Sequence, residues 1–423
     1  MKRLRNPVLD GRSRQMIHSR QRPGRGPIHT ADIRIQEENM SALVKIMTAA
    51  LAVIVAVCLL ALGALYLRWG GGAYLRDMST APLLGETALE VVANLDFPPG
   101  NIAVAGSGRV FFTFHPDANP SLRVAELVKG KPVPYPDASY LLKNKDGHYY
   151  TTVLSLRVDS RNRLWTLDHG NHGTDRPRLY AFDLATDTLV YEYEFPSGVA
   201  GFGSMMNDLQ IDPKAEFMYI ADTSIVANSP AILVLDIAAK KCRRLLASHP
   251  SFMATNHRMR IDDRDIALFG AIPLKINLDS IALDRQGKTL YFGPLTGDTM
   301  YRIDTVSLRD ATLSADALAA RVEKYAAKSH SDGMTTDNAG NLYLGDMERY
   351  AIHVIRPGGK LETLVKSPRL RWPDGFSFGP GGWLYVSCSA LQHVIFRDEA
   401  HVRANAPYQI FRLRAEAPGV PGQ

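Results

Sequence analysis

The chain has 423 residues, 46% of them hydrophobic and 22% charged, which is typical of a globular protein with a large core. Its formal net charge is +6, but residues 1–40 hold nine Lys or Arg and four Asp or Glu, so +5 of that charge lies in this segment. The remainder is close to neutral and offers no basic surface of the kind that nucleic acids bind. Three cysteines without CxxC or Cys/His spacing exclude a zinc motif.

The N-terminal segment predicts a membrane anchor. Residues 1–42 lack hydrophobic periodicity, and we expect a disordered, basic tail there. The 22 residues from Ile46 to Leu67 carry no charge and are long enough to cross a bilayer, so we predict a transmembrane signal anchor over residues 43–68. Because basic residues precede this span, the positive-inside rule places the N-terminus in the cytoplasm and the rest of the chain on the periplasmic or extracellular side. Residues 69–86 are expected to be a linker.

Two alternatives stay open for this segment. Met40 or Met47 would serve equally well as the first residue of the protein. The small residues Ala61-Leu62-Gly63-Ala64 also leave room for cleavage, which would convert the anchored protein into a secreted one.

A repeated frame organises the rest of the chain. Each copy has a leading residue, a short run typical of a strand, a turn cluster and a second β-rich run. The six copies are NIAVAGSGRVFFTF from Asn101, LSLRVDSRNRLWTLD from Leu154, NDLQIDPKAEFMYIAD from Asn207, DSIALDRQGKTLYFG from Asp279, DGMTTDNAGNLYLGD from Asp332 and DGFSFGPGGWLYVS from Asp374. We call these six first residues the leader residues; they are spaced by 53, 53, 72, 53 and 42 positions.

Repeats of about 40–50 residues that carry short strands and turns indicate a β-propeller. We therefore predict an all-β, six-bladed β-propeller over residues 87–415, preceded by the single transmembrane helix and followed by a tail over residues 416–423. The longer spacing between the third and fourth leader residues predicts an insertion over residues 240–277.

Three local patterns refine this architecture. Residues 88–95 resemble a strand and are expected to close the ring as an outer strand of the last blade, near the strand candidate at 408–413. Arg260–Leu268 predicts a hairpin. Residues 314–328 place apolar side chains on one helical face behind a capping serine, which predicts a helix over a rim of the propeller.

Five of the six leader residues are Asn or Asp. If the leader residues begin the innermost strands, the pseudo-rotation axis of a propeller brings them together around its central channel. The predicted ligand-binding channel is lined by Asn101, Asn207, Asp279, Asp332 and Asp374. The alternative is that these are ordinary turn residues that fix the starts of strands.

The copies resemble a known family. The runs RLWTLDHGN, NDLQIDPKAEFMYIADTS, LDSIALDRQGKTLYFG and SDGMTTDNAGNLYLGD are similar to the yellow / major royal jelly protein family, and the resemblance spans residues 90–400. Bacterial members of this type are described as related to dopachrome-converting yellow proteins. The resemblance implies a six-bladed propeller of the secreted type that binds or converts a small molecule in its channel, with dopachrome-type tautomerisation as the implied reaction.

The chain is more distantly similar to the senescence-marker-protein/gluconolactonase propellers. Those lactonases hold a divalent metal through a Glu, two Asn and an Asp that also serves as base. Carried over position by position, Asn207 falls on one Asn and Asp332 on the Asp, whereas Asp279 replaces the second Asn and Asn101 replaces the Glu. The resemblance therefore implies these four as metal ligands, with two departures from the lactonase pattern.

Such oxygen donors suit Ca²⁺ or Mg²⁺. The catalytic candidates are Asp332 and Asp279. With a metal, Asp332 would take a proton from water during lactone hydrolysis; without one, the cluster would hold a cationic amine or abstract a proton in a tautomerisation. A metal-dependent lactone hydrolase and a non-catalytic ligand-binding or scaffold propeller thus remain alternatives to a tautomerase. No motif indicates a protein partner.

A second candidate is the segment Asp168-His169-Gly170-Asn171-His172, since two His three apart beside an Asp can bind metal. Its place in a turn-rich loop favours a solvated loop instead. Asp168, Asp222 and Asp346 share a strand-end position, and we expect them to brace neighbouring blades.

Two further pairs of residues have structural roles in this interpretation. Cys242 and Cys388 could form a disulfide, although their count favours two free thiols. Trp165 and Trp372 are expected to pack between blades.

Overall fold

The computed structural model describes residues 30–143, 147–268 and 270–423. The chain divides into two compact units, Met1–Ala64 and Leu65–Gln423. Residues 1–29, which make up most of the predicted tail, lie outside the described residues.

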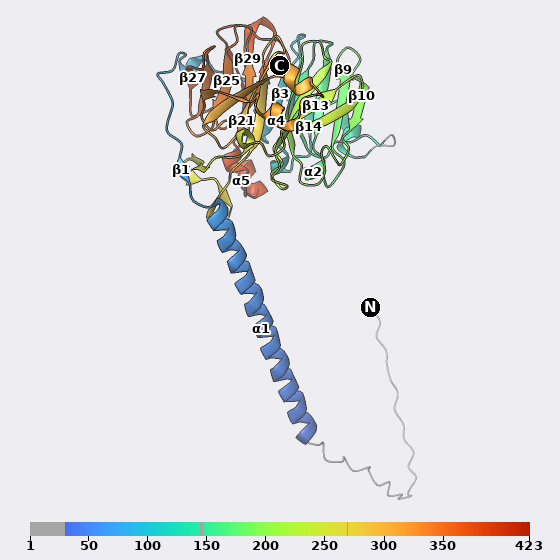
Figure 1. Cartoon of the computed structure of the whole chain (residues 1–423), viewed down its shortest axis with the longest axis vertical. Helices are drawn as coiled ribbons and strands as arrows, with labels where there is room; N and C mark the ends of the chain where they lie inside the picture. Colours follow the sequence, from blue (N-terminus) through green and yellow to red (C-terminus); the bar gives the residue numbers. More distant parts are fainter. Residues whose placement is uncertain (1–29, 144–146, 269) are drawn as a thin grey trace, which may run out of the picture. The chain divides into compact units, whose positions relative to one another are not determined.

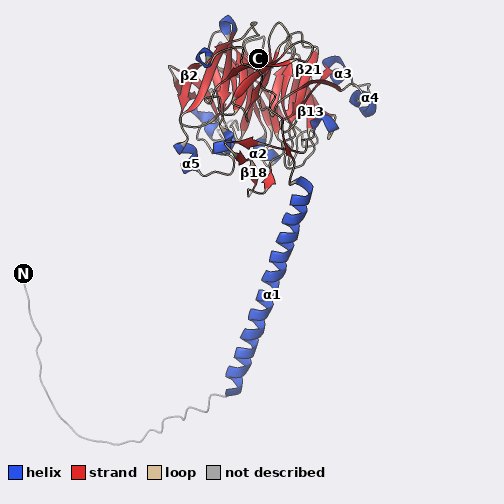
Figure 2. Cartoon of the chain, turned by 90° about the vertical axis from the view of Figure 1, so that its left-hand side faces the viewer, coloured by secondary structure: helices blue, strands red, loops and turns tan. Residues whose placement is uncertain are grey.

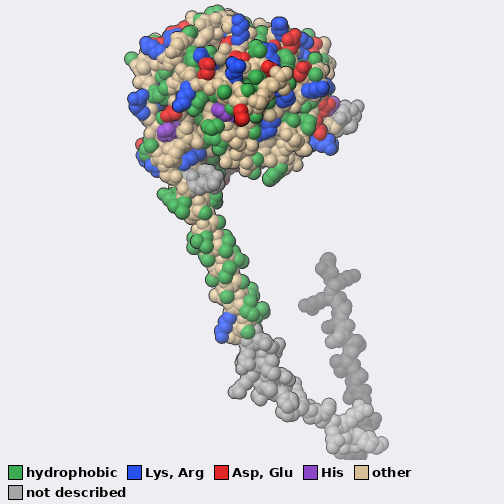
Figure 3. Space-filling view, in the orientation of Figure 1, with side chains coloured by type: hydrophobic (Ala, Val, Ile, Leu, Met, Phe, Trp, Pro, Cys, Tyr) green, Lys and Arg blue, Asp and Glu red, His purple; other side chains and the backbone are tan. Residues whose placement is uncertain are grey.

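The first unit contains a long helix, α1 (Thr30–Trp69), which begins before the expected start of the anchor at residue 43. Its segment Met40–Leu67 has a single charged residue, Lys45, near its N-terminal end. Apolar side chains are spread over the surface of this helix in Figure 3. Because about 0.8 kcal/mol is lost for each methylene left in water, such a surface favours lipid. The helix is long and apolar enough to cross a membrane.

The second unit is a six-bladed β-propeller, as predicted. The described residues form six four-stranded antiparallel sheets around one axis (Figures 1 and 2). Blade 1 contains, from inner to outer strand, β3 (Pro99–Val104), β4 (Val110–Phe114), β5 (Val124–Val128) and β6 (Lys131–Pro134). Blade 2 contains, in the same order, β7 (Val153–Val158), β8 (Arg163–Asp168), β9 (Arg178–Asp183) and β10 (Thr188–Glu194). Blade 3 contains β11 (Met206–Ile211), β12 (Phe217–Asp222), β13 (Ala231–Asp236) and β14 (Lys241–Leu245).

Blades 4 to 6 continue the same order. Blade 4 contains β20 (Leu278–Leu283), β21 (Thr289–Pro294), β22 (Thr299–Asp304) and β23 (Glu323–Ala327). Blade 5 contains β24 (Met334–Thr336), β25 (Leu342–Asp346), β26 (Ala351–Ile355) and β27 (Leu361–Lys366). Blade 6 contains β28 (Pro373–Phe378), β29 (Trp383–Cys388), β30 (Tyr408–Arg414) and β2 (Glu90–Leu95). The innermost strands follow one another around the axis, and β28 of blade 6 lies against β3 of blade 1.

The ring closes in blade 6, where strands from the two ends of the propeller pair. The N-terminal strand β2 runs antiparallel to β30, with Glu90 opposite Arg412 and Leu95 opposite Tyr408. Closure by the strand over residues 88–95 is therefore confirmed. Because the pairing joins segments more than 300 residues apart, it fixes blade 1 against blade 6 through backbone hydrogen bonds.

Each turn between the first and second strands of blades 2 to 5 begins with an Asp five residues after the leader residue. The carboxylate of Asp159 accepts the backbone N–H groups of Arg161 and Arg163 and the Trp165 indole N–H. Asp337 accepts two turn N–H groups in the same way. These side chains close the turns locally, so the repeated Asp is a turn residue and has no part in the channel.

The inner strands are buried on both faces because neighbouring blades cover them, whereas the outer strand β10 alternates between exposed and partly buried residues. Blades meet through large apolar side chains. Trp165 of blade 2 is fully buried in a cluster with Leu209 and Met218 of blade 3, which confirms its packing between blades. Charged side chains of both signs are dispersed over the propeller surface seen in Figure 3.

The insertion and the predicted helix differ from expectation. The first predicted insertion residues form β14, and the rest contains β15 (His257–Arg258), β16 (Arg260–Ile261), β17 (Arg264–Asp265), β18 (Ala267–Leu268) and β19 (Ile272–Pro273). The hairpin of β16 and β17 is shorter than predicted, since residues 267–268 pair with β19 instead.

The helix predicted over residues 314–328 is wrong for most of its length. Ser314 caps a short helix, α4 (Ala315–Ala319), by accepting the Ala317 N–H. The chain then enters β23, which pairs with β22 as the outer strand of blade 4. The backbone groups along β22 need partners, and this requirement outweighs helical periodicity. The other short helices are α2 (Gly170–Gly173), α3 (Thr305–Arg309) and α5 (Glu399–Ala404).

The two ends of the propeller are distinct. The inner strands begin at one end, which we call the leader end, and it carries the insertion, α2 and α5. The last residues of the chain lie at the opposite end (Figures 1 and 2). There Gln423 donates to the Val158 carbonyl and Phe378 exchanges backbone hydrogen bonds with residues 422 and 423, so residues 416–423 are packed against the propeller. Cys242 and Cys388 are free thiols.

Candidate functional site

All six leader residues line one cavity of about 310 Å³ at the leader end. Five are the second or third residue of an inner strand, and Asp332 lies two residues before β24. Because each inner strand starts at the same end of the ring, the side chains from six distant segments meet around the axis. Leu154 is the apolar exception in this ring.

A chain of hydrogen bonds links four of these blades across the cavity floor. The Asn207 amide donates to an oxygen of Asp279 at 2.6 Å, and the Thr223 hydroxyl donates to the same oxygen at 3.1 Å. The carboxyl groups of Asp279 and Asp332 hydrogen bond to each other. The Trp372 indole N–H then donates to Asp332 at 2.7 Å. Two carboxyl groups in such contact disfavour the state in which both are ionised, because two negative charges at that separation repel each other.

The electrostatics of this floor favour a protonated Asp279. Burial, followed by the neighbouring Asp332 carboxylate, raises the pKa of Asp279 well above its usual value. Burial and the same Asp332 charge also raise the pKa of Asp374 well above its usual value, while the Ser389 hydroxyl opposes that change. Three carboxyl groups thus crowd one cavity, and at least one stays protonated in the range where free Asp is ionised.

Replacing Asp279 with asparagine is expected to stabilise the protein at high pH. A raised pKa in the folded state means that the stabilisation from the bound proton is complete below the unfolded pKa and is lost as pH rises through the folded pKa. The amide keeps the oxygen that accepts from Asn207 and never ionises. The variant should therefore gain at least about 1 kcal/mol relative to wild type between pH 4 and pH 8, the energy of one pKa unit.

Urea unfolding of both proteins across this pH range measures the difference. Asp263→Asn, in the exposed turn of the insertion hairpin, is the matched control and should leave the pH profile unchanged. A stability difference between Asp279→Asn and wild type that does not grow with pH would contradict a protonated Asp279.

Beneath this floor lies a second polar layer that the sequence did not reveal. The Arg157 guanidinium is 1% exposed and donates to the Asn101 side-chain oxygen at 2.5 Å. It also pairs with the Asp208 carboxylate at 3.3 Å. Asp208 in turn accepts from the Ser155 hydroxyl and from the backbone N–H of Ile281. This ion pair ties blades 1 to 4 together inside the channel. The available signal was an Arg within the apolar strand LSLRV.

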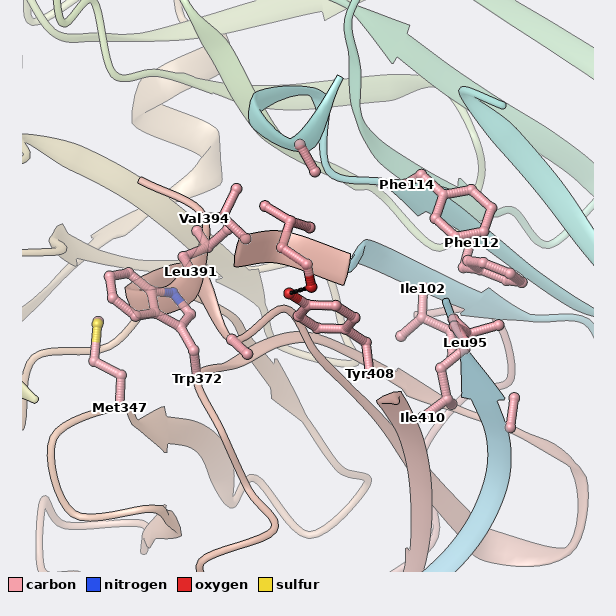
Figure 4. Packing of buried hydrophobic residues seen from close by; sticks show 14 of the residues in the cluster. Leu95, Ile102, Phe112, Phe114, Met347, Trp372, Leu391, Val394, Tyr408 and Ile410 are labelled. Carbon is pink, nitrogen blue, oxygen red and sulfur yellow. Dashed lines mark hydrogen bonds between the residues drawn. The ribbon is translucent and has the colours of Figure 1, made fainter. Parts of the chain in front are cut away.

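Apolar side chains surround the polar floor. The insertion supplies Leu274 and Ile276, and the loop between β29 and β30 supplies Leu391, Ile395 and Phe396. Trp372 belongs to both parts: it is fully buried beside Met347, Leu391 and Val394 (Figure 4), and its N–H points to the acid pair. Trp372 therefore packs as expected and also orients Asp332.

The histidine segment is not a solvated loop. His169 is 3% exposed, and its ring Nδ1 accepts the backbone N–H of His172 at 2.9 Å. Burial lowers the pKa of His169 to about 3, so the ring is neutral at physiological pH. His172 lines the cavity wall. The segment is drawn inward because Asp168 accepts the Gly170 N–H and holds the loop against the blade.

The three strand-end aspartates act within their own blades. Asp168 accepts the backbone N–H of Thr151, and Asp222 accepts that of Met205, so each fastens the loop that leads into the inner strand of the same blade. Asp346 accepts N–H groups of the turn that follows it. The prediction that they brace neighbouring blades is therefore wrong, since their partners are all local.

Lys328 is a further buried residue near the site, and no pattern in the sequence indicated its position there. Lys328 is fully buried, and its Nζ donates to the Ser329 carbonyl at 3.0 Å and contacts the Ser331 hydroxyl at 3.2 Å. Burial lowers its pKa to about 7, while Asp279 and nearby carboxylates oppose the change. The protonation of Lys328 is therefore linked electrostatically to the carboxyl groups around it.

Comparison with known proteins places this chain in a family. Residues 151–365 match the family model described as major royal jelly protein, which is more than half of the chain. The chain belongs to the major royal jelly protein family. It is 27% identical to major royal jelly protein 3 of Apis mellifera over 53% of this chain and 42% of that protein. It is also 27% identical to protein yellow of Drosophila subobscura over 54% of this chain and 44% of that protein. The matches therefore span less than half the length of these relatives.

Solved propellers share the fold of this royal jelly family member. A calcium-binding protein, regucalcin, from Agrobacterium tumefaciens aligns with a TM-score of 0.52 and 14% identity over 81% of this chain and 99% of that one. A protein assigned as a gluconolactonase aligns with a TM-score of 0.50 and 12% identity over 83% of this chain and 99% of that one. These likenesses concern the fold, in agreement with the distant lactonase resemblance of the repeats.

The lactonase resemblance implies Asn101, Asn207, Asp279 and Asp332 as metal ligands, and the hydrogen bonds of these residues show which oxygen atoms are free to bind a metal. Asn101 directs its side-chain oxygen to Arg157, and Asn207 directs its amide nitrogen to Asp279. Asp279 and Asp332 are the two carboxylic acids of this set, and they lie beside each other at the cavity floor. Among the residues that the structure describes, no three His, Cys, Asp or Glu side chains are grouped closely enough to hold a metal ion. The lactonase ligand set is thus not reproduced, and we derive no reaction step through a metal.

Proposed function

We propose that the propeller binds a small molecule in the leader-end cavity and moves a proton within it, with Asp332 as base and Asp279 as acid. The observation that supports this proposal is the hydrogen-bonded pair of carboxyl groups at the floor of an apolar-walled cavity. Pairs of carboxyl groups whose environments separate their pKa values serve as matched acids and bases. Tautomerisation of the dopachrome type is the reaction that this pair suits.

The mechanism is the transfer of a proton from carbon to a carbonyl oxygen across a conjugated system. Asp332, oriented by the Trp372 N–H, removes a proton from carbon, and the electron pair of that bond moves into the conjugated system. Asp279 donates its proton to the carbonyl oxygen at the other end of that system. The pair then exchanges its proton through the shared hydrogen bond and regains its starting state. Proton transfer by positioned groups contributes about 10²–10⁴-fold in rate.

The volume and polarity of the cavity limit the size and charge of the ligand that it can hold. A volume of about 310 Å³ lies at the lower end of the range of ligand pockets, so the site suits a single small ring system. The walls are apolar and the floor is acidic, so a flat molecule with one polar edge and a partial positive charge is favoured.

The experiment compares purified full-length protein in detergent with the variants Asp332→Asn and Asp279→Asn, using dopachrome as substrate. We expect both variants to lose at least about 10²-fold in kcat with the fold retained. Asp263→Asn, far from the cavity in the insertion hairpin, should keep wild-type turnover. Equal turnover in all four proteins would reject the acid pair, and binding without turnover in wild type would favour the non-catalytic ligand-binding propeller.

A divalent cation is the second candidate ligand, because three carboxyl groups line one cavity and the Asp332 charge raises the pKa values of both Asp279 and Asp374. Ca²⁺ prefers oxygen donors, and the carboxyl groups of Asp279 and Asp332 are the residues that would hold it. Calcium titration calorimetry on wild type and Asp332→Asn tests this. Binding that the variant loses would support a metal-dependent lactone hydrolase, and absence of binding would exclude it.

The proposal also covers the cellular location of the protein. We infer that α1 anchors the protein as a single-pass segment with a cytoplasmic N-terminus, because the basic residues precede the apolar span. A phosphatase reporter that is active only outside the cytoplasm, fused after Arg68, should be active. Activity of a cytoplasmic reporter at this fusion point would overturn the orientation.

A further inference from the structure

The point at which the chain enters the propeller is fixed at the leader end. Strand β1 (Ala73–Tyr74) pairs in parallel with β15 of the insertion. The Tyr74 hydroxyl donates to Asp265 at 3.0 Å, and the Arg258 guanidinium lies 4.4 Å from the centre of the Tyr74 ring. The same insertion lines the cavity with Leu274. The tether is therefore fastened to the wall of the cavity mouth.

The tether between the apolar span and this attachment is short. The span ends at Leu67 and β1 begins at Ala73, so residues 68–72 form the whole connection. Even fully extended, five residues reach at most about 18 Å. With the span in a bilayer, as proposed above, a tether of this length holds β1 within about 18 Å of the bilayer surface.

Exposed apolar side chains gather at the leader end. Phe202 is 75% exposed, Val226 is 54% exposed and Phe396 is 59% exposed, and Ile225 stands beside Val226. The first two come from adjacent loops, since the Ala227 N–H donates to the Gly203 carbonyl. Phe396 and Ile225 also line the cavity. Single exposed apolar residues are common, but a group around one cavity mouth marks an interaction surface.

The charge beside this group suits a lipid surface. Arg397, which is exposed, follows Phe396 directly in the chain. Aromatic side chains next to basic ones are typical of the membrane interface, where the ring enters the headgroup region and the cation meets lipid phosphate.

We propose that the leader end rests on the bilayer that α1 crosses, with Phe202, Val226 and Phe396 inserted among the lipid headgroups. The mouth of the cavity then faces the lipid, and an amphiphilic ligand dissolved in the bilayer reaches the acid pair without crossing water. This inference rests on the proposed membrane anchor, because without α1 in the bilayer the tether sets no orientation.

The test is spin-label accessibility in full-length protein reconstituted into vesicles of phosphatidylcholine and phosphatidylglycerol. Native cysteines are replaced by alanine, and single labels are placed through Phe202→Cys and Phe396→Cys. Val306→Cys on α3 is the matched control, because Val306 is apolar and 66% exposed but lies at the opposite end. Leu60→Cys within the span reports on the anchor itself. Collision with oxygen, which concentrates in lipid, is compared with collision with a water-soluble nickel chelate.

We expect the ratio of oxygen to nickel collisions at positions 202 and 396 to exceed that at position 306 severalfold. Equal ratios at 202 and 306, with a lipid-exposed label at position 60, would overturn the inference and leave the anchor intact. A water-exposed label at position 60 would refute the anchor. Spin–spin broadening at position 202 with low collision rates for both reagents would assign the patch to a second copy of the chain, which would also overturn the proposal.

Discussion

Replacing Arg157 with methionine is expected to destabilise the propeller by about 3–5 kcal/mol, because the substitution leaves Asp208 as an uncompensated charge inside the channel. Both side chains are almost fully buried, and the pair connects blades 1 to 4. Burial already raises the pKa of Asp208, and Arg157 is the largest influence that opposes this change. The loss is a large part of the roughly 5–15 kcal/mol that holds a typical domain folded. Urea unfolding followed by tryptophan fluorescence measures it.

The control is the double substitution of Arg157→Met with Asp208→Asn. The asparagine is neutral and can still accept from the Ser155 hydroxyl and the backbone, so the double variant should regain most of the lost stability. If Arg157→Met alone unfolds at the wild-type urea concentration, or if the second substitution makes no difference, the ion pair does not hold the blades together.

Replacing Gly333 with alanine should have a comparable effect, roughly 3 kcal/mol or more of lost stability. A Cβ atom at this position would lie 1.4 Å from the Asp374 carbonyl oxygen. Blades 5 and 6 therefore approach each other too closely at this point for any side chain. The effect follows from sterics, since the backbone at Gly333 does not adopt a positive φ. Thermal unfolding of full-length protein in detergent measures the loss.

Gly106→Ala serves as the comparison. A Cβ atom there would meet no atom within 4 Å, and its φ is also not positive, so the variant should unfold with wild type. Comparable melting temperatures for the two alanine variants would show that the seam between blades 5 and 6 relaxes freely, contrary to the close contact in the structure.

The Asp-Gly pair at 332–333 connects fold and site. Gly333 lets the chain pass beside blade 6, and this close approach brings Asp332 within reach of the Trp372 indole. The same contact sets the geometry of the acid pair. A substitution that loosens this seam is therefore expected to weaken ligand turnover even where the fold survives, because acid–base groups act only within hydrogen-bond reach of the proton they move.

Parts of the site could be predicted because they repeat. The leader residues recur in one register, so symmetry alone indicates that Asn207, Asp279 and Asp332 share an axis. Arg157 and Asp208 could not be found in this way, since each occurs in a single blade and neither has a periodic partner. Their pairing depends on how far each inner strand extends into the channel, which is a property of the assembled ring.

Local signals failed where long-range pairing competed with them. Residues 323–327 carry helical periodicity, yet they form a strand because β22 offers unpaired backbone groups. His169 looks like a loop residue, yet its backbone N–H donates to the Thr152 carbonyl and its ring is buried. In both cases the deciding partner lies elsewhere in the chain or in the fold.

By itself, the sequence determined the number of blades, the strand that closes the ring, the apolar span and the identity of the leader side chains, because each of these is carried by local pattern or by repetition. Only the tertiary structure decided which carboxyl groups meet at the cavity floor, which buried side chains lie beneath them and which end of the propeller holds the tether. Those properties depend on distances of a few ångströms between segments far apart in the chain. Hydrogen bonding and burial set such distances only after all six blades have closed.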